Sequence, residues 1–276
     1  DWNGGLDMAR ERGESVAFTA AYAGNFTVLA KRLRDLAKTG RDGVEIPLPL
    51  QSLLEMDYRG AQEKPGKLMA YCREMEAPTE KVTISPEFLA CAMERMAQEL
   101  RENIRNTQWV GDGADLHWFN SYYDNSGRQV EGGTANPVRM MLTGQVFTIL
   151  SGTATEAQVR QILRSVDWYL WDPSRGGVCL NTDFREVKLD MGRMFGFAYG
   201  NKENSAVFCH MAVMYAYALY SRGFAAEGWR MLEQLYSQSA DFARSRILPG
   251  IPEYFDDRGQ GMYPYLTGAG SWLLMT

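Results

Sequence analysis

The spacing of apolar residues along the chain predicts long helices joined by polar loops. From Ser15 to Lys38, apolar residues recur every three or four positions, which is the spacing of one helix face. Ser85-Pro86-Glu87 supplies a cap, a first-turn proline and an acid for a second helix, whose apolar stripe continues to about Asn106. Four more helices are predicted, over residues 137–151, 155–169, 205–221 and 225–242.

Two of these segments carry further signals. Thr153-Ala154-Thr155-Glu156 has the residues of a capping box at the start of its helix. Residues 205–221 are apolar nearly all round, so this helix is expected to be buried on more than one side.

Little β structure is expected. Arg41–Pro49 reads as a loop, because Pro47 and Pro49 disfavour regular helix. Trp118–Val130 reads as a hairpin with its turn at Asp124–Gly127. Paired long helices with only a hairpin or two favour an all-α solenoid or an α/α toroid. No strict repeat is visible, which disfavours tetratricopeptide or HEAT arrays.

Composition narrows the class of partner. The net charge of −5 argues against nucleic acid as a partner, because proteins that bind nucleic acid usually present a basic face. No run of about 18 apolar residues is present to span a membrane, and the first residues do not form a signal peptide, so we expect a cytoplasmic protein. The four cysteines are scattered singly, so no metal site is expected.

Two segments are candidates for ligand binding. Gly200-Asn201-Lys202 leads into the apolar helix that carries His210, and a helix N-terminus favours anions. Thr267-Gly268 lies in a glycine-rich tail where the backbone can approach a ligand closely. Each has a structural alternative, a core histidine in one case and a turn before the last helix in the other.

Aromatic rings mixed with Asn and Asp in Trp118–Asn125 suit carbohydrate, or else belong to an ordinary hairpin with surface tyrosines. Several acids lie among Gly, Asn and aromatic residues, and the sequence does not show which of them face one substrate: Asp1, Asp7, Glu14, Asp190, Glu203 and Glu253.

Four stretches together resemble a known family. They are Asp1-Trp2-Asn3-Gly4 followed by Gly13-Glu14-Ser15-Val16 (D-W-N-D … G-E-S-V), Gln145–Gly152 (Q-x-W-x-x-x-S-G), Lys202–His210 (K-x-N-G-x-F-x-H) and Leu266–Trp272 (L-T-G-T-A-x-W). In this order the chain resembles the inverting glycoside phosphorylases of glycoside hydrolase family 94. That family includes cellobiose and chitobiose phosphorylases, β-glucan oligosaccharide phosphorylases and the C-terminal domain of cyclic β-1,2-glucan synthases.

The resemblance implies a fold and a reaction. The fold is an (α/α)6 barrel whose loops bind a β-linked gluco-oligosaccharide. Inorganic phosphate, a co-substrate rather than a cofactor, attacks the anomeric carbon while one carboxylic acid protonates the leaving oxygen. The product is α-glucose 1-phosphate, formed with inversion in a reversible reaction, so phosphate takes the place that water has in an inverting hydrolase.

The resemblance also assigns residues. His210, Thr267 and Gly268 would hold phosphate. The substrate sugar would be contacted by Trp2, Lys202, Glu203 and Glu253.

One departure concerns the acid. The family places it two positions after the tryptophan, where this chain has Gly4, which has no side chain. Asp1 or Asp7 would then have to serve. A barrel that binds β-glucan without turnover is an alternative, and so is an inverting hydrolase, which would need a second carboxylate about 6.5–9.5 Å from the first.

A second departure concerns extent. Residues 1–276 are expected to be the C-terminal portion of one barrel domain, without the family's N-terminal β-sandwich and first barrel helices. Such a portion exposes an apolar flank, so we expect it to need the N-terminal part or a homodimer partner.

Overall fold

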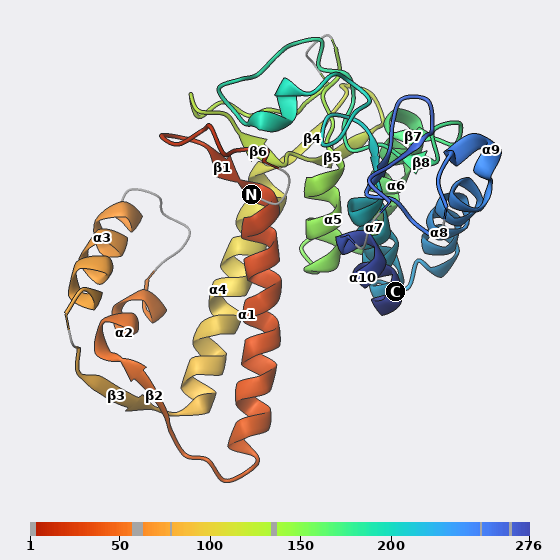
Figure 1. Cartoon of the computed structure of the whole chain (residues 1–276). Helices are drawn as coiled ribbons and strands as arrows, with labels where there is room; N and C mark the ends of the chain where they lie inside the picture. The colour runs from red at the N-terminus through yellow and green to blue at the C-terminus, as the bar shows by residue number, and fades with distance from the viewer. Residues whose placement is uncertain (1–3, 57–62, 78, 134–136, 249, 265–266) are drawn as a thin grey trace. The chain divides into compact units, whose positions relative to one another are not determined.

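The computed structural model describes residues 4–56, 63–77, 79–133, 137–248, 250–264 and 267–276, and it contains two compact units (Figure 1). Unit 1 comprises Asp1–Phe18 and Gln108–Thr276, and unit 2 comprises Thr19–Thr107. The chain therefore passes from one unit to the other twice, first within a helix and again at Thr107–Gln108.

Unit 2 is built on two long helices, α1 (Val16–Ala37) and α4 (Pro86–Thr107), which lie side by side in Figure 1. Both were predicted within two residues of these bounds. Arg34 of α1 makes ion pairs with Glu87 and Glu94 of α4. The segment between the helices forms β2 (Val44–Pro47), α2 (Leu48–Leu54), α3 (Lys64–Met75) and β3 (Lys81–Ile84).

Strands β2 and β3 pair antiparallel, with Val44 opposite Ile84. The prediction of a loop over Arg41–Pro49 was therefore wrong. Pro47 ends the strand as the helix cap, and Pro49 lies in the first turn of α2, where a missing N–H costs nothing because that group has no helical partner.

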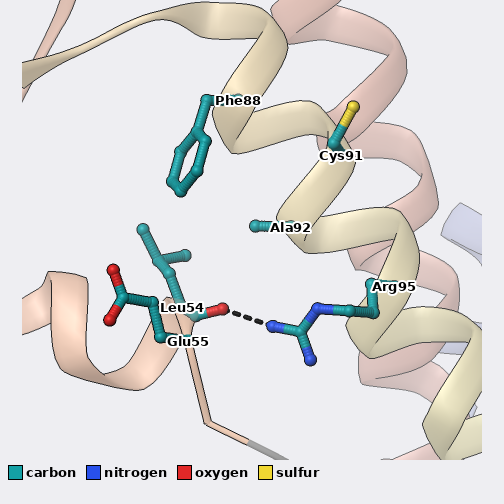
Figure 2. A pocket seen from close by; sticks show the side chains of 6 residues that line it. All are labelled: Leu54, Glu55, Phe88, Cys91, Ala92 and Arg95. Atoms are coloured by element: carbon teal, nitrogen blue, oxygen red, sulfur yellow. Dashed lines mark hydrogen bonds between the residues drawn. The ribbon is translucent and has the colours of Figure 1, made fainter.

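A cavity of about 380 Å³ lies between the end of α2 and α4 (Figure 2). Arg95 of α4 reaches across it and donates hydrogen bonds to the backbone oxygens of Leu54 and Met56. The bond to Leu54 satisfies the last carbonyl group of α2, which has no partner in the helix, and the bond to Met56 holds the segment that follows.

Unit 1 contains the remaining helices. They are α5 (Leu142–Leu150), α6 (Glu156–Tyr169), α7 (Cys209–Ser221), α8 (Ala225–Ala240), α9 (Phe242–Ser245) and α10 (Gly268–Met275), with a 3₁₀ turn, η1, at Arg193–Gly196. The helix α7 packs against α5, α8 and α10, and most of its residues are buried. This confirms the prediction that it is covered on more than one side.

Short antiparallel strands connect these helices. The pairs are β1 (Glu14–Ser15) with β6 (Tyr122–Tyr123), β4 (Trp109–Gly111) with β5 (His117–Phe119), and β7 (Trp171–Asp172) with β8 (Gly177–Val178). Three more strands, β9 (Val207–Phe208), β10 (Tyr254–Phe255) and β11 (Gly261–Met262), form one sheet in the order β11-β10-β9.

The expectation of a hairpin or two was too low even for the described residues. The turn at Asp124–Gly127 is present, but β5 and β6 pair mainly with β4 and β1. Strands of two or three residues are too short to show alternation in the sequence.

Two helix starts also differ from prediction. Helix α7 begins at Cys209 rather than Ser205, because Val207 and Phe208 pair with β10. Helix α5 begins at Leu142 rather than Pro137, because the preceding residues are extended and bond to the 180–182 segment. Both are tertiary pairings with distant parts of the chain.

The cap of α6 also differs. The capping box is made by Thr155 with Gln158, two residues later than the predicted Thr153 with Glu156. Overall the described chain is rich in helix, and none of its helices is long and apolar enough to cross a membrane.

Candidate functional site

The first residues of α7 and α10 lie against each other. Thr267 caps α10, its hydroxyl oxygen accepting a hydrogen bond from the Ala269 N–H at 3.2 Å. A Cβ atom added to Gly268 would lie 2.5 Å from both Cε1 and Nδ1 of the His210 ring. Only glycine allows this approach, so the structure brings together His210, Thr267 and Gly268, although their segments are more than fifty residues apart.

This arrangement suits an anion. Backbone N–H groups at a helix N-terminus carry partial positive charge, and here two such ends meet. Burial lowers the pKa of His210, so its imidazole is neutral near pH 7 and offers one ring N–H as a donor. Phosphate binding by these residues remains a prediction.

The sheet β11-β10-β9 places Glu253 beside this position. The Glu253 carbonyl accepts a hydrogen bond from the Cys209 N–H at 2.9 Å, and its own N–H donates to Met262 at 3.1 Å. Burial, together with the charges of neighbouring acids and Tyr263, raises the pKa of Tyr254 to about 12. The sheet therefore holds Glu253 and the tyrosines next to the start of α7.

The ammonium group of Lys202 lies over two aromatic rings. Its Nζ is 4.3 Å from the centre of the Tyr263 ring and 5.7 Å from that of Phe197. Burial opposes the charge, but a hydrogen bond to Tyr263 and the nearby charges of Glu253 and Glu203 outweigh it and raise the pKa of Lys202. The group is therefore a fixed ammonium ion, close to both glutamates.

Glu203 is a largely buried acid of this region. Its side chain is only 14% exposed, and its Oε1 lies 3.9 Å from Nη2 of Arg193, whose side chain is 64% exposed. Its other oxygen, Oε2, is buried and has no hydrogen-bond partner among the described residues. A buried carboxylate oxygen without a partner is costly, which makes it a candidate for contact with a ligand.

Gly4 lies next to the same arginine. Its φ is +63°, and a Cβ added there would be 2.6 Å from Nε of Arg193. The Arg193 side chain thus fills the space that a side chain at position 4 would need. Asp1 and Trp2 lie outside the described residues.

Asp7 has a structural task. It is exposed, and its Oδ1 accepts a hydrogen bond from the Arg193 N–H at 2.9 Å, at the start of η1. Glu14 pairs through its backbone in β1, and Asp190 lies within 4.0 Å of Lys188.

The aromatic cluster at Trp118–Asn125 belongs to the core. Trp118, Phe119 and Tyr122 are completely buried, as is Asn120. These three rings are closed to carbohydrate. Tyr122 is no surface residue, but Tyr123 is half-buried and the turn at Asp124–Gly127 forms as the hairpin reading expects.

Sequence reasoning missed Arg193 and Tyr263. Tyr263 lies in the same glycine-rich tail as Thr267, and that nearness was a usable signal. Arg193 comes from a segment with no motif, and only the fold brings it to Gly4 and Glu203. Among the described residues, no group of three His, Cys, Asp or Glu is arranged to hold a metal ion.

Comparison with known proteins settles the family. The model of the catalytic domain of the glycosyl hydrolase 94 superfamily matches residues 87–276. The chain belongs to this superfamily. Three of the four stretches that suggested it lie within the matched residues, and the Asp1–Val16 stretch lies outside them.

Curated relatives of this superfamily member are phosphorylases. Solabiose phosphorylase of Paenibacillus borealis is 25% identical over 69% of this chain and 25% of its own length. Cellobionic acid phosphorylase of Neurospora crassa is 26% identical over 49% of this chain and 18% of its own length. The 3-O-β-D-glucopyranosyl-β-D-glucuronide phosphorylase of Paenibacillus borealis is 22% identical over 66% of this chain and 24% of its own length. The chain thus spans a quarter or less of the length of these relatives.

Among solved structures, the family 63 mannosylglycerate hydrolase of Thermus thermophilus has a TM-score of 0.43. It is 15% identical over 78% of this chain and 44% of its own. A likeness at this level supports no argument about function.

Proposed function

We propose that this chain forms part of an inverting glycoside phosphorylase that converts a β-linked gluco-oligosaccharide and phosphate to α-glucose 1-phosphate. The observation that carries the proposal is the meeting of the α7 and α10 N-termini at His210 and Gly268. A hydrolase has no need of an anion site there, whereas a phosphorylase requires one. Membership of the superfamily and the phosphorylase relatives support the same reaction.

In this proposal the helices belong to the C-terminal portion of an (α/α)6 barrel, and the site opens among its loops. Phosphate binds to the N–H groups of the two helix ends, to the Thr267 hydroxyl and to the His210 ring. Lys202, Glu203 and Glu253, with Trp2, contact the sugar. Phosphate attacks the anomeric carbon from the face opposite the leaving oxygen, which inverts the configuration.

The test uses the full-length protein in the synthetic direction. It is incubated with α-glucose 1-phosphate and a panel of β-glucosyl and monosaccharide acceptors, and phosphate release is measured. We expect release that depends on the acceptor. Cleavage of an oligosaccharide without phosphate would instead identify a hydrolase.

The anion site is tested separately with two glycines of one helix. Gly268→Ala places a methyl group against the His210 ring, so the KM for phosphate should rise at least tenfold, as expected when a charge-assisted contact is lost. Gly270→Ala is the matched control, because a Cβ there meets no atom within 4 Å. Equal kinetics in both variants would argue against phosphate at this position.

Gly4 favours a second candidate, a barrel that binds β-glucan without turnover. Glycine at position 4 carries no acid where the family resemblance places one, and a side chain there would have to displace Arg193. Calorimetric binding of a β-gluco-oligosaccharide, together with no phosphate release in the assay above, would establish this alternative.

A further inference from the structure

Phosphorolysis needs a proton donor that Gly4 does not supply. The glycosidic oxygen leaves with developing negative charge, and a sugar hydroxyl is a poor leaving group unless it is protonated. Because Gly4 has no side chain, another group has to supply the proton.

The described acids of the site differ in the partners that their carboxylate oxygens already have. Asp7 accepts the hydrogen bond that starts η1. Glu253 and Glu203 both lie close enough to the Lys202 ammonium for their charges to raise its pKa. Glu203 makes a long 3.9 Å ion pair with Arg193 through one oxygen, and its buried Oε2 has no hydrogen-bond partner among the described residues.

The position of Glu203 also fits. It follows Lys202, whose ammonium lies over Tyr263, and it shares Arg193 with Gly4. Glu203 and Gly4, the position at which the family resemblance expects the acid, therefore lie next to the same arginine side chain.

We propose that Glu203 is the general acid of this phosphorylase, taking the place of the side chain missing at Gly4. This inference rests on the proposed function. As phosphate oxygen bonds to the anomeric carbon, the bond from that carbon to the leaving oxygen breaks, and the proton on Glu203 moves to that oxygen. The glutamate is left as a carboxylate and recovers its proton from the phosphate hydroxyl through solvent, so no further reactant is needed.

The Arg193 guanidinium lies 3.9 Å from Oε1 of Glu203 and stabilises the carboxylate that forms when the proton leaves.

The experiment compares two leaving groups in the full-length protein. One substrate is a β-glucosyl oligosaccharide whose leaving hydroxyl needs a proton. The other is 2,4-dinitrophenyl β-glucoside, whose leaving group departs without one. For Glu203→Gln we expect kcat on the oligosaccharide to fall about 10²–10⁴-fold, while kcat on the dinitrophenyl glucoside stays within about threefold of wild type.

Two variants serve as comparisons. Glu253→Gln should weaken the binding of both substrates to a similar extent, because binding contacts do not depend on the leaving group. Glu233→Gln, on the exposed face of α8, should change neither. Thermal melting of each variant checks that it is folded.

The outcomes are distinct. A parallel loss on both substrates in Glu203→Gln would overturn the inference and leave Glu203 a binding residue. A leaving-group-dependent loss in Asp7→Asn or Glu253→Gln would move the acid to that residue. If wild type forms no α-glucose 1-phosphate from either substrate, the proposed function itself fails.

Discussion

Arg193 determines what a side chain at position 4 would encounter. Aspartate tolerates the left-handed backbone of Gly4, but its carboxylate would abut the guanidinium and stay ionised. We therefore expect Gly4→Asp to raise phosphorolysis of an oligosaccharide by less than tenfold, as measured by release of α-glucose 1-phosphate. A gain of a hundredfold or more would place the acid at position 4 and exclude Glu203. Arg193→Ala in the same background shows how far the ion pair limits the new acid.

Ser205 gives a second prediction at this scale. Its φ is +65°, a conformation that costs a non-glycine residue about 1–2 kcal/mol. Ser205→Gly should raise the free energy of unfolding by about 1 kcal/mol, measured by urea denaturation. Ser205→Ala keeps a Cβ in the strained conformation and should give no such gain. A fall in stability of the glycine variant would show that the serine side chain outweighs the strain.

At the scale of elements, the cap of α6 is directly testable. Thr155 accepts from the Gln158 N–H, and Gln158 accepts from the Thr155 N–H at 3.0 Å. Thr155→Ala should destabilise the protein by about 1 kcal/mol, and Thr155→Ser should keep most of the stability. Equal melting temperatures for the two variants would contradict a capping role.

The elements also show where sequence reasoning succeeds. The helices α1 and α4 were predictable because their apolar stripes and caps are local. The starts of α5 and α7 were not, because residues such as Val207 pair with strands that lie far along the chain. The same division holds for the site. His210 and Thr267-Gly268 were found from their sequence context and the family resemblance, whereas the contact between them depends on how α10 packs on α7.

At the scale of the whole molecule, the stability of the folded state depends on pH through Glu131. This buried carboxylate accepts hydrogen bonds from the N–H groups of Met141 and Ser121, which ties the start of α5 to the segment before β6. Burial raises the pKa of Glu131 to about 8, from an ordinary 4.5. The folded state thus binds this proton more tightly than the unfolded state, so the stability it contributes is complete below pH 4.5 and is lost as pH rises through about 8.

His210 acts with the opposite sign. Burial lowers the pKa of His210, so the unfolded state takes up its proton first and stability is lost as pH falls below the ordinary value of 6.5. Melting temperatures from pH 5 to about 8 should therefore fall toward the alkaline end in wild type, and Glu131→Gln should remove much of that slope. An unchanged slope in the variant would assign the pH dependence to other groups.

The contact between Gly268 and His210 has a consequence for local opening. A ligand that bridges the two helix ends holds both closed, although each would otherwise fray independently. Saturating phosphate should then slow amide hydrogen exchange at the first turn of α7 and of α10 by the same factor. Ligand binding at this site would thus hold the last helix, α10, against α7 in the core.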